Sequence, residues 1–129
     1  MNAPTVTISN TLHAGPYTLR PWREEDVPSL VRYGNNKKIW RNVGDGFPYP
    51  YTEQKARDWV TFAKTMDPAR QFAYAVEFEG EAIGGVGYER LCEGGFRTAQ
   101  LGYWFGEPFW GKGIATQLLM ALTEHLFTD

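Results

Sequence analysis

The residues with the clearest chemical potential are two glycines that flank a lysine, in the run Trp110-Gly-Lys-Gly-Ile-Ala115. A strand-like pattern precedes this run and an amphipathic helical pattern follows it. Glycine leaves the backbone N–H groups unobstructed, and the first N–H groups of a helix have no partner within the helix. The helix dipole adds positive potential at the same place, so the run predicts a binding site for a pyrophosphate.

Other interpretations of these glycines fit less well. The segment from Gly106 to Lys112 satisfies the P-loop pattern G-x-x-x-x-G-K, but Gly113 stands where Ser or Thr must bind magnesium. The bulky residues 108–110 also occupy the part of a P-loop that wraps around phosphates. The dinucleotide-binding pattern G-x-G-x-x-G fails because Thr116 takes the place of the third glycine. A purely architectural strand-to-helix turn stays open as an alternative.

The N-terminal half predicts one strand and two helices that could position such a site. Residues 1–16 read as an irregular or short-strand lead-in, and a strand follows at Tyr17–Trp22. Asp26 is a predicted cap for a helix that ends near Tyr33, and Thr52 is a predicted cap for a second helix. One face of this second helix collects its apolar residues: Ala56, Trp59, Val60, Ala63 and Met66.

The C-terminal half changes to a period of two and then returns to a helical period. Strands are predicted at 72–78, 82–91 and 97–105, with turns at Gly80-Glu81 and Glu93-Gly94-Gly95. A last helix covers about 112–127, with its apolar stripe on Ile114, Leu118, Leu122 and Leu126. The order is strand, helix, helix, three antiparallel strands and helix, which is an α+β arrangement in a single domain, 1–129.

Composition excludes several classes of function. The chain has 129 residues, 43% of them hydrophobic, and a formal net charge of −2, so it offers no basic surface for nucleic acid. Cys92 is the only cysteine, and His13 and His125 are scattered, so no metal site is expected. No apolar run is long enough to span a membrane, and no signal pattern starts the chain, which favours the cytoplasm.

Residues 17–129 resemble the GNAT (GCN5-related N-acetyltransferase) family, in particular its ribosomal-protein alanine acetyltransferase (RimJ/RimL-like) branch. Three segments in the expected order carry the resemblance: Tyr17-Thr-Leu-Arg-Pro21 with Glu25 and Asp26, Phe47-Pro-Tyr-Pro-Tyr-Thr52 with Trp59, and Leu101-Gly-Tyr-Trp104 followed by Trp110-Gly-Lys-Gly-Ile-Ala-Thr116. The last of these is the most specific. The resemblance implies a mixed, mainly antiparallel sheet with helices on both faces.

The resemblance also implies acetyl-CoA as co-substrate, with no metal, and acetyl transfer to a primary amine of a protein N-terminus or a small molecule. The implied cofactor-binding residues are Phe105, Gly106, Gly111, Lys112, Gly113, Ile114, Ala115 and Thr116. The backbone of Phe105 and Gly106 would pair with the pantetheine arm. The implied acceptor pocket would be lined by Trp40, Phe47, Tyr49 and Tyr103.

No catalytic residue is assigned from the sequence. Members of this branch often carry a glutamate just before the Gly-Tyr-Trp run, whereas this chain has Gln100, which cannot act as a base at neutral pH. Glu107 is the remaining weak candidate, because it lies near the glycines. A non-catalytic module that binds coenzyme A, or acts through contacts with other chains, is the alternative function.

Members of the family continue after the last helix with a β-α-β-β segment, which this chain lacks. The expectation is therefore a truncated domain that comprises about two-thirds of the family fold. The unpaired edge of the strand 97–105 and the apolar face of the helix 112–127 predict a homo-oligomer, a swapped dimer or marginal stability.

Overall fold

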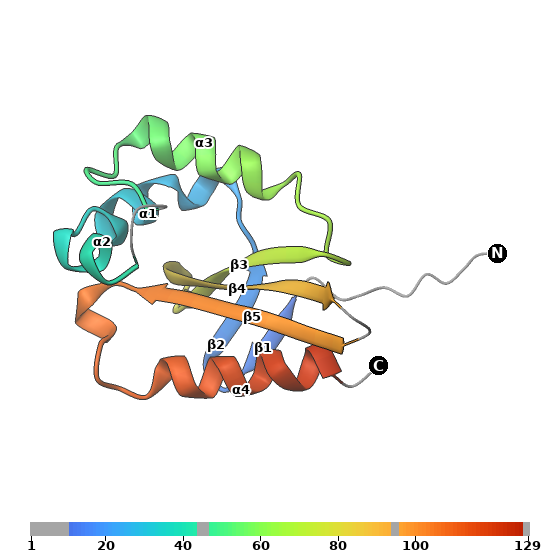
Figure 1. Ribbon diagram of the computed structural model, residues 1–129. Helices are drawn as coiled ribbons and strands as arrows, with labels where there is room; N and C mark the ends of the chain where they lie inside the picture. The colour runs from blue at the N-terminus through green and yellow to red at the C-terminus, as the bar shows by residue number, and fades with distance from the viewer. Residues whose placement is uncertain (1–10, 44–46, 94–95, 128–129) are drawn as a thin grey trace.

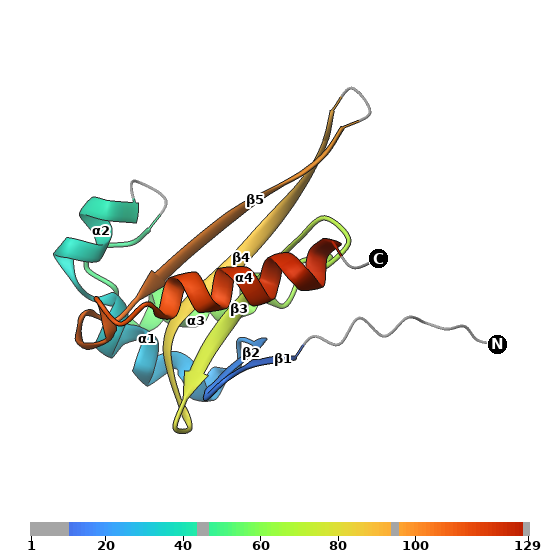
Figure 2. The same ribbon diagram turned by 90° about the horizontal axis from the view of Figure 1, so that it is seen from below.

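A computed structural model of the chain describes residues 11–43, 47–93 and 96–127. Within these ranges, five strands form one sheet in the order β1-β2-β3-β4-β5 (Figure 1). The strands are β1 (Leu12–Ala14), β2 (Tyr17–Pro21), β3 (Gln71–Phe78), β4 (Glu81–Glu93) and β5 (Phe96–Phe105). All four pairings are antiparallel, and β4 and β5 extend beyond β3 as a two-stranded ribbon (Figure 2).

The helices cover both faces of the sheet, as predicted. Figure 1 shows α1 (Val27–Gly34), α2 (Lys37–Val43) and α3 (Glu53–Ala63) on one side and α4 (Ile114–Phe127) on the other. Two short 3₁₀ segments, η1 (Glu24–Asp26) and η2 (Glu107–Phe109), precede α1 and the turn before α4. The sheet is thus the middle layer of three, and each of its faces buries its own cluster of side chains.

The two clusters show which residues each helix buries. On the α4 face, Ile114, Leu118 and Leu122 pack against the sheet with Leu19, Tyr74, Val76 and Ile83. On the α1–α3 face, the cluster includes Trp22, Leu30, Ile39, Phe47, Ala56, Val60 and Ala75. Alternate residues of β3 therefore serve opposite faces, which explains why its sequence is apolar almost throughout.

The predicted order of strands and helices is confirmed. β1 lies in the lead-in that was predicted to be irregular or a short strand, α2 is an additional element, and α4 starts at Ile114 rather than near Lys112. The second predicted helix ends at Ala63, so Met66 lies beyond it, where it packs against the cluster on the α4 face. The part of the sheet that the structure describes is antiparallel throughout rather than mixed. The predicted Gly94-Gly95 turn lies outside the described residues.

The two predicted helix caps have different outcomes. Thr52 caps α3 as expected, because its hydroxyl accepts the Lys55 N–H at 3.2 Å. Asp26 precedes α1, but its side chain does not cap that helix. Its carboxylate instead binds the Arg20 guanidinium through two contacts of 2.7 and 2.8 Å and accepts the Arg23 N–H. A buried arginine attracts the carboxylate more strongly than an N–H group does.

Candidate active site

The glycine turn, Gly111–Gly113, lies between η2 and the first residue of α4. Gly113 directly precedes the helix, and its carbonyl accepts the first helical hydrogen bond, from the Gln117 N–H at 3.2 Å. The N–H groups of residues 114–116 belong to the first turn of the helix. They therefore have no carbonyl within the helix to which they could donate a hydrogen bond. The three residues of the turn are themselves exposed, and no described residue accepts a hydrogen bond from their N–H groups. Six consecutive amides thus surround one exposed helix N-terminus.

The backbone conformation explains why both glycines are needed. Gly111 has a φ of +76° and Gly113 a φ of +72°, a region that side chains with a Cβ rarely adopt. A Cβ placed on either residue would meet no protein atom within 4 Å. The protein thus leaves open space around the turn, and only the dihedral angles demand glycine. Ile114 is buried beneath the turn, whereas Thr116 is exposed beside it.

Aromatic residues before the turn hold it in place. Phe109 packs edge-on against Tyr33 and Phe78, with ring centroids 5.6 and 6.2 Å away. The Trp110 indole N–H donates to the Phe105 carbonyl at 2.8 Å. The Lys112 ammonium lies 5.9 Å above the Phe109 ring, so its charge sits at the edge of the turn. The bulky residues that argued against a P-loop are therefore anchors for this loop.

The backbone at the end of β5 differs from the prediction in one respect. The Gly106 N–H donates to the Ile83 carbonyl at 2.8 Å, and the Gly106 carbonyl accepts the Phe109 N–H. Gly106 thus has no free backbone group for a ligand. The bond to Ile83 makes Gly84 and Phe105 a non-hydrogen-bonded pair, so the N–H of Phe105 points to the open edge of the sheet, as does that of Tyr103.

Glu107 is held by two residues of the α2 region. Its carboxylate accepts the Asn36 amide at 2.9 Å and the Lys38 ammonium at 2.8 Å. The contacts with Lys38 first, and Asn36 second, lower the pKa of Glu107. A carboxylate with a lowered pKa is a weaker base, so the geometry fits a tie between α2 and η2 better than proton abstraction.

An aromatic cavity of about 280 Å³ opens on the α1–α3 face of the sheet. Phe47 and Tyr103, two of the predicted acceptor residues, line it. Trp40 and Tyr49 are not among the lining residues, and their rings lie instead against each other with centroids 6.0 Å apart. The aromatic cavity therefore gathers half of the predicted set.

Sequence reasoning missed most of the walls of the aromatic cavity. Trp22 and Trp104 lie nearly parallel with centroids 6.5 Å apart, and Phe47 meets Trp104 edge-on at 5.3 Å. The other walls include Tyr51, Trp59, Gly85 and Gly87. A Cβ on Gly85 would lie 2.9 Å from the Trp104 ring nitrogen and 3.1 Å from Trp22. Gly85 and Gly87, at alternate positions of β4, were the sequence signal for this cavity, because glycines leave room for aromatic rings above the sheet.

Two of the tyrosines that line this cavity, Tyr51 and Tyr74, are buried, and burial raises the pKa of both hydroxyls. Tyr51 is 3% exposed, and burial raises the pKa of its hydroxyl far above the ordinary value. Tyr51 therefore stays protonated through the neutral range. Among the residues that the structure describes, no Asp, Glu, His, Lys or Arg lines the aromatic cavity.

Comparison with known proteins defines the class. A family model described as an acetyltransferase (GNAT) domain matches residues 17–129, and the chain belongs to this family. It is 33% identical over 124 residues to the ribosomal-protein-serine acetyltransferase of Escherichia coli, a match that covers 94% of this chain and 65% of that protein. It is 28% identical over 123 residues to the N-acetyltransferase p20 of Bacillus licheniformis, described as uncharacterized, with 92% and 67% covered.

Solved structures confirm the predicted GNAT fold. RimL, a ribosomal L7/L12 alpha-N-protein acetyltransferase in complex with coenzyme A, is similar with a TM-score of 0.73 and 25% identity, over 89% of this chain and 66% of that one. A GNAT acetyltransferase from Bacillus anthracis has a TM-score of 0.75 at 16% identity, a likeness of fold, over 92% and 67%. The chain thus spans about two-thirds of the length of the relatives it matches.

Two features of the described residues concern membranes and metals. None of their helices combines the length and the apolarity that a membrane span needs. Among the same residues, no three His, Cys, Asp or Glu side chains come together as metal ligands would.

Proposed function

We propose that this chain transfers an acetyl group from acetyl-CoA to a primary amine, on a protein N-terminus or a small molecule. The observation that carries the proposal is the exposed set of amides at residues 111–116, held open by two glycines with positive φ. A pyrophosphate carries the charge and the acceptor atoms that such a helix N-terminus binds. The E. coli and RimL relatives, which are named as ribosomal-protein acetyltransferases, support the reaction and the acceptor class.

The residues that would hold the coenzyme A pyrophosphate are Gly111, Lys112, Gly113, Ile114, Ala115 and Thr116. Their N–H groups supply hydrogen bonds, and the exposed Thr116 hydroxyl can add one more. Lys112 would add positive charge, since its ammonium lies 5.9 Å from the centroid of the Phe109 ring that precedes the turn. The absence of any protein atom near the Cβ positions of both glycines leaves room for the phosphate oxygens.

The pantetheine arm would pair with the open edge of β5 as an additional strand. Tyr103 and Phe105 supply the outward N–H groups, whereas the predicted partner Gly106 uses both of its backbone groups within the protein. An outward N–H at this edge can donate to the thioester carbonyl and stabilise the charge that develops there. The thioester that acetyl-CoA supplies would then lie beside the aromatic cavity, because Tyr103 and Trp104 line that cavity.

The acceptor amine would enter through the aromatic cavity and must lose a proton to attack. None of the described residues that line the cavity is acidic or basic, so we propose water as the proton acceptor. We place Glu107 outside the reaction, as the residue that ties η2 to α2. Of the four predicted acceptor residues, Phe47 and Tyr103 would contact the acceptor, because both line the cavity.

The absence of a base in the aromatic cavity also favours the alternative, a non-catalytic module that binds coenzyme A. The two functions share the glycine turn and differ only in turnover. Release of free coenzyme A thiol in the presence of an amine would separate them, because a module that only binds the cofactor produces no thiol.

The glycine turn provides the first test, through Gly113→Ala with Gly80→Ala as its matched control. Gly80 has a φ of +81° and open space at its Cβ, like Gly113, but lies in the β3–β4 turn. Both substitutions should lower the stability by about 1 kcal/mol through backbone strain. Acetyl-CoA at 100 times its dissociation constant should stabilise the wild type and Gly80→Ala by about 2.7 kcal/mol, which is several degrees in melting temperature.

Gly113→Ala should lose most of that ligand-induced shift, as measured by thermal denaturation with and without acetyl-CoA. An equal shift in all three proteins would show that the cofactor binds elsewhere. No shift in the wild type would refute a working cofactor site in this chain.

A further inference from the structure

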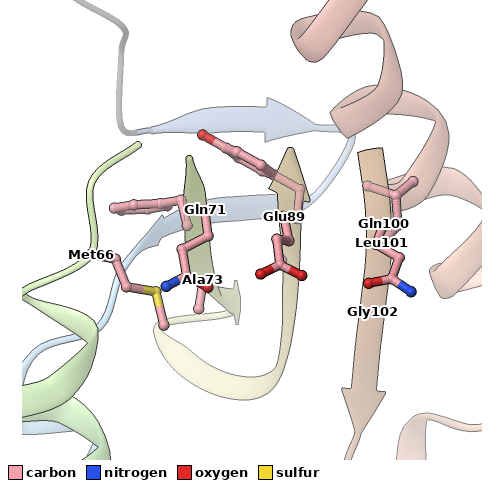
Figure 3. Close-up of a pocket in the computed structure, with 10 residues that line it drawn as sticks. Met66, Gln71, Ala73, Glu89, Gln100, Leu101 and Gly102 are labelled. Atoms are coloured by element: carbon pink, nitrogen blue, oxygen red, sulfur yellow. The ribbon is translucent and has the colours of Figure 1, made fainter. Parts of the chain in front are cut away.

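The aromatic cavity continues into a second cavity on the same face of the sheet. This second cavity has a volume of about 350 Å³ and is lined by residues of β3, β4, β5 and Met66 (Figure 3). The two cavities share three lining residues, Ala73, Gly87 and Gly102. They are therefore two ends of one trough.

The shared floor has a simple cause in the register of the strands. Ala73 pairs with Gly87, and Gly87 pairs with Gly102, so the smallest side chains form a row across three strands. A Cβ on Gly102 would meet no protein atom within 4 Å. The trough runs along β5 from Trp104 to Gln100, four residues and roughly 13 Å of extended strand.

The far end of the trough is polar. Gln71 pairs with Glu89, which pairs with Gln100, so these three side chains form the next row beyond the small residues. Figure 3 shows the polar ends of Gln71, Glu89 and Gln100 on one side of the sheet. The register places them on the same face as Ala73, which is the α1–α3 face. Two amides that flank a carboxylate offer several oxygens that accept hydrogen bonds from a cation.

Among the described residues that line the two cavities, Glu89 is the only one with a charged side chain. Within the part of the chain that the structure describes, no lysine, arginine or hydrogen-bond donor is recorded on its carboxylate. The neighbouring Arg90 guanidinium lies above the Tyr88 ring, 5.7 Å from its centroid. One uncompensated negative charge therefore stands at one end of a trough that is otherwise uncharged.

We propose that the trough binds an acceptor with a second positive charge, located on the order of 10 Å from the reacting amine. Resting on the proposed function, this assigns the reacting amine to the end near Trp104 and the second cation to Glu89, Gln71 and Gln100. The apolar chain between the two cations lies over Ala73, Gly87 and Gly102. Two kinds of ligand carry two such positive charges: an aliphatic diamine, and a peptide whose free N-terminus is followed by a basic side chain.

Calorimetric titration of the full chain without acetyl-CoA tests the proposal independently of turnover. The probes are 1,8-diaminooctane against octylamine, and tetrapeptide amides with lysine against norleucine at their fourth position. The dicationic member of at least one pair should bind two- to fivefold more tightly, as expected for an ion pair with an exposed carboxylate. The pair that shows the difference identifies the source of the cation.

Glu89→Gln should remove this preference and leave the binding of the monocationic probe unchanged. Glu25→Gln, which removes an exposed carboxylate from η1, is the control for net charge and should keep the preference. Gly102→Leu fills the floor of the trough where no protein atom obstructs it, and should weaken both probes in a protein that still melts cooperatively.

Equal binding of both members of each pair to the wild type would overturn the proposal. So would a preference that survives Glu89→Gln or that Glu25→Gln removes equally. These outcomes are distinct from failure of the proposed function, which appears as a missing acetyl-CoA shift or missing transfer. A Glu89-dependent preference without transfer would leave the cation site in place and refute only the enzyme.

Discussion

At the scale of single residues, Glu107 shows how neighbours decide what a carboxylate can do. Its position beside the glycine turn made it the weak candidate for a catalytic base. In the structure, Lys38 and Asn36 occupy its oxygens and lower its pKa. Because the pKa in the folded state lies below the unfolded value, these contacts stabilise the fold above the unfolded pKa. That stabilisation is lost as the pH falls through the folded pKa.

Lys38→Met should therefore raise the pKa of Glu107 towards its ordinary value. The carboxyl titration can be followed by carbon-detected NMR in both proteins. Lys37→Met removes the same charge from the start of α2 without removing the contact at 2.8 Å, and should move the titration much less. An unchanged midpoint in Lys38→Met would show that the contact is not formed in solution.

The residue types predicted the conformation of the glycine turn well and the walls of the aromatic cavity poorly. Glycines at an exposed turn usually mark positions with a positive φ, and both Gly111 and Gly113 have one. Phe47 and Trp40 look alike in sequence, yet only Phe47 reaches the aromatic cavity. Glu89 carries no local signal, since it joins Gln71 and Gln100 only through the register of three strands.

At the scale of elements, the strongly periodic segments were predictable and α2 was not. The first predicted helix ends near Tyr33, and nothing in the sequence predicted that Asn36 starts another helix. Its side chain accepts the Lys38 N–H at 2.9 Å, and its carbonyl accepts the Trp40 N–H. Ile39 is the only buried residue of α2, so the helix has no apolar stripe to detect.

An ion-pair network joins β2, η1 and β3 in a way that no single-element pattern could predict. Arg20 binds Asp26 through two contacts and Glu77 at 2.6 Å, and Arg20 and Asp26 are only 7% and 4% exposed. The Asp26 hydrogen bond is the main cause that raises the pKa of Arg20. The network sets the position of α1 against the sheet, because Asp26 directly precedes that helix.

Asp26→Asn should destabilise the fold by about 3 kcal/mol, the lower end of the range for breaking a buried pair, because Glu77 still binds Arg20. Urea denaturation measures the change. Glu53→Gln breaks the exposed pair with Arg57 on α3 and should cost less than about 0.5 kcal/mol. Similar losses in the two variants would show that burial of the Arg20 pair contributes little.

At the scale of the whole molecule, the two faces of the sheet are covered but the β5 edge is open. Strand β5 is the last of the sheet and pairs with β4 alone among the described strands. Apolar side chains are exposed on β5 and α4, with Tyr103 at 51% and Met120 at 67%. The proposed pantetheine path uses this same edge, so a ligand and another strand would compete for its backbone groups.

Self-association through the β5 edge is the expected result, because a long unpaired strand with exposed apolar residues offers hydrogen bonds and apolar area together. Light scattering after size exclusion should show a mass above 14.7 kDa that rises with concentration. Leu101→Lys places a charge on the edge strand and should shift the chain towards the monomer. Phe62→Lys, at a 52% exposed site on α3, should have no such effect. Because the edge is also the proposed cofactor path, acetyl-CoA should favour the monomer in the wild type, and a stable monomer at every concentration without ligand would refute the edge as an interface.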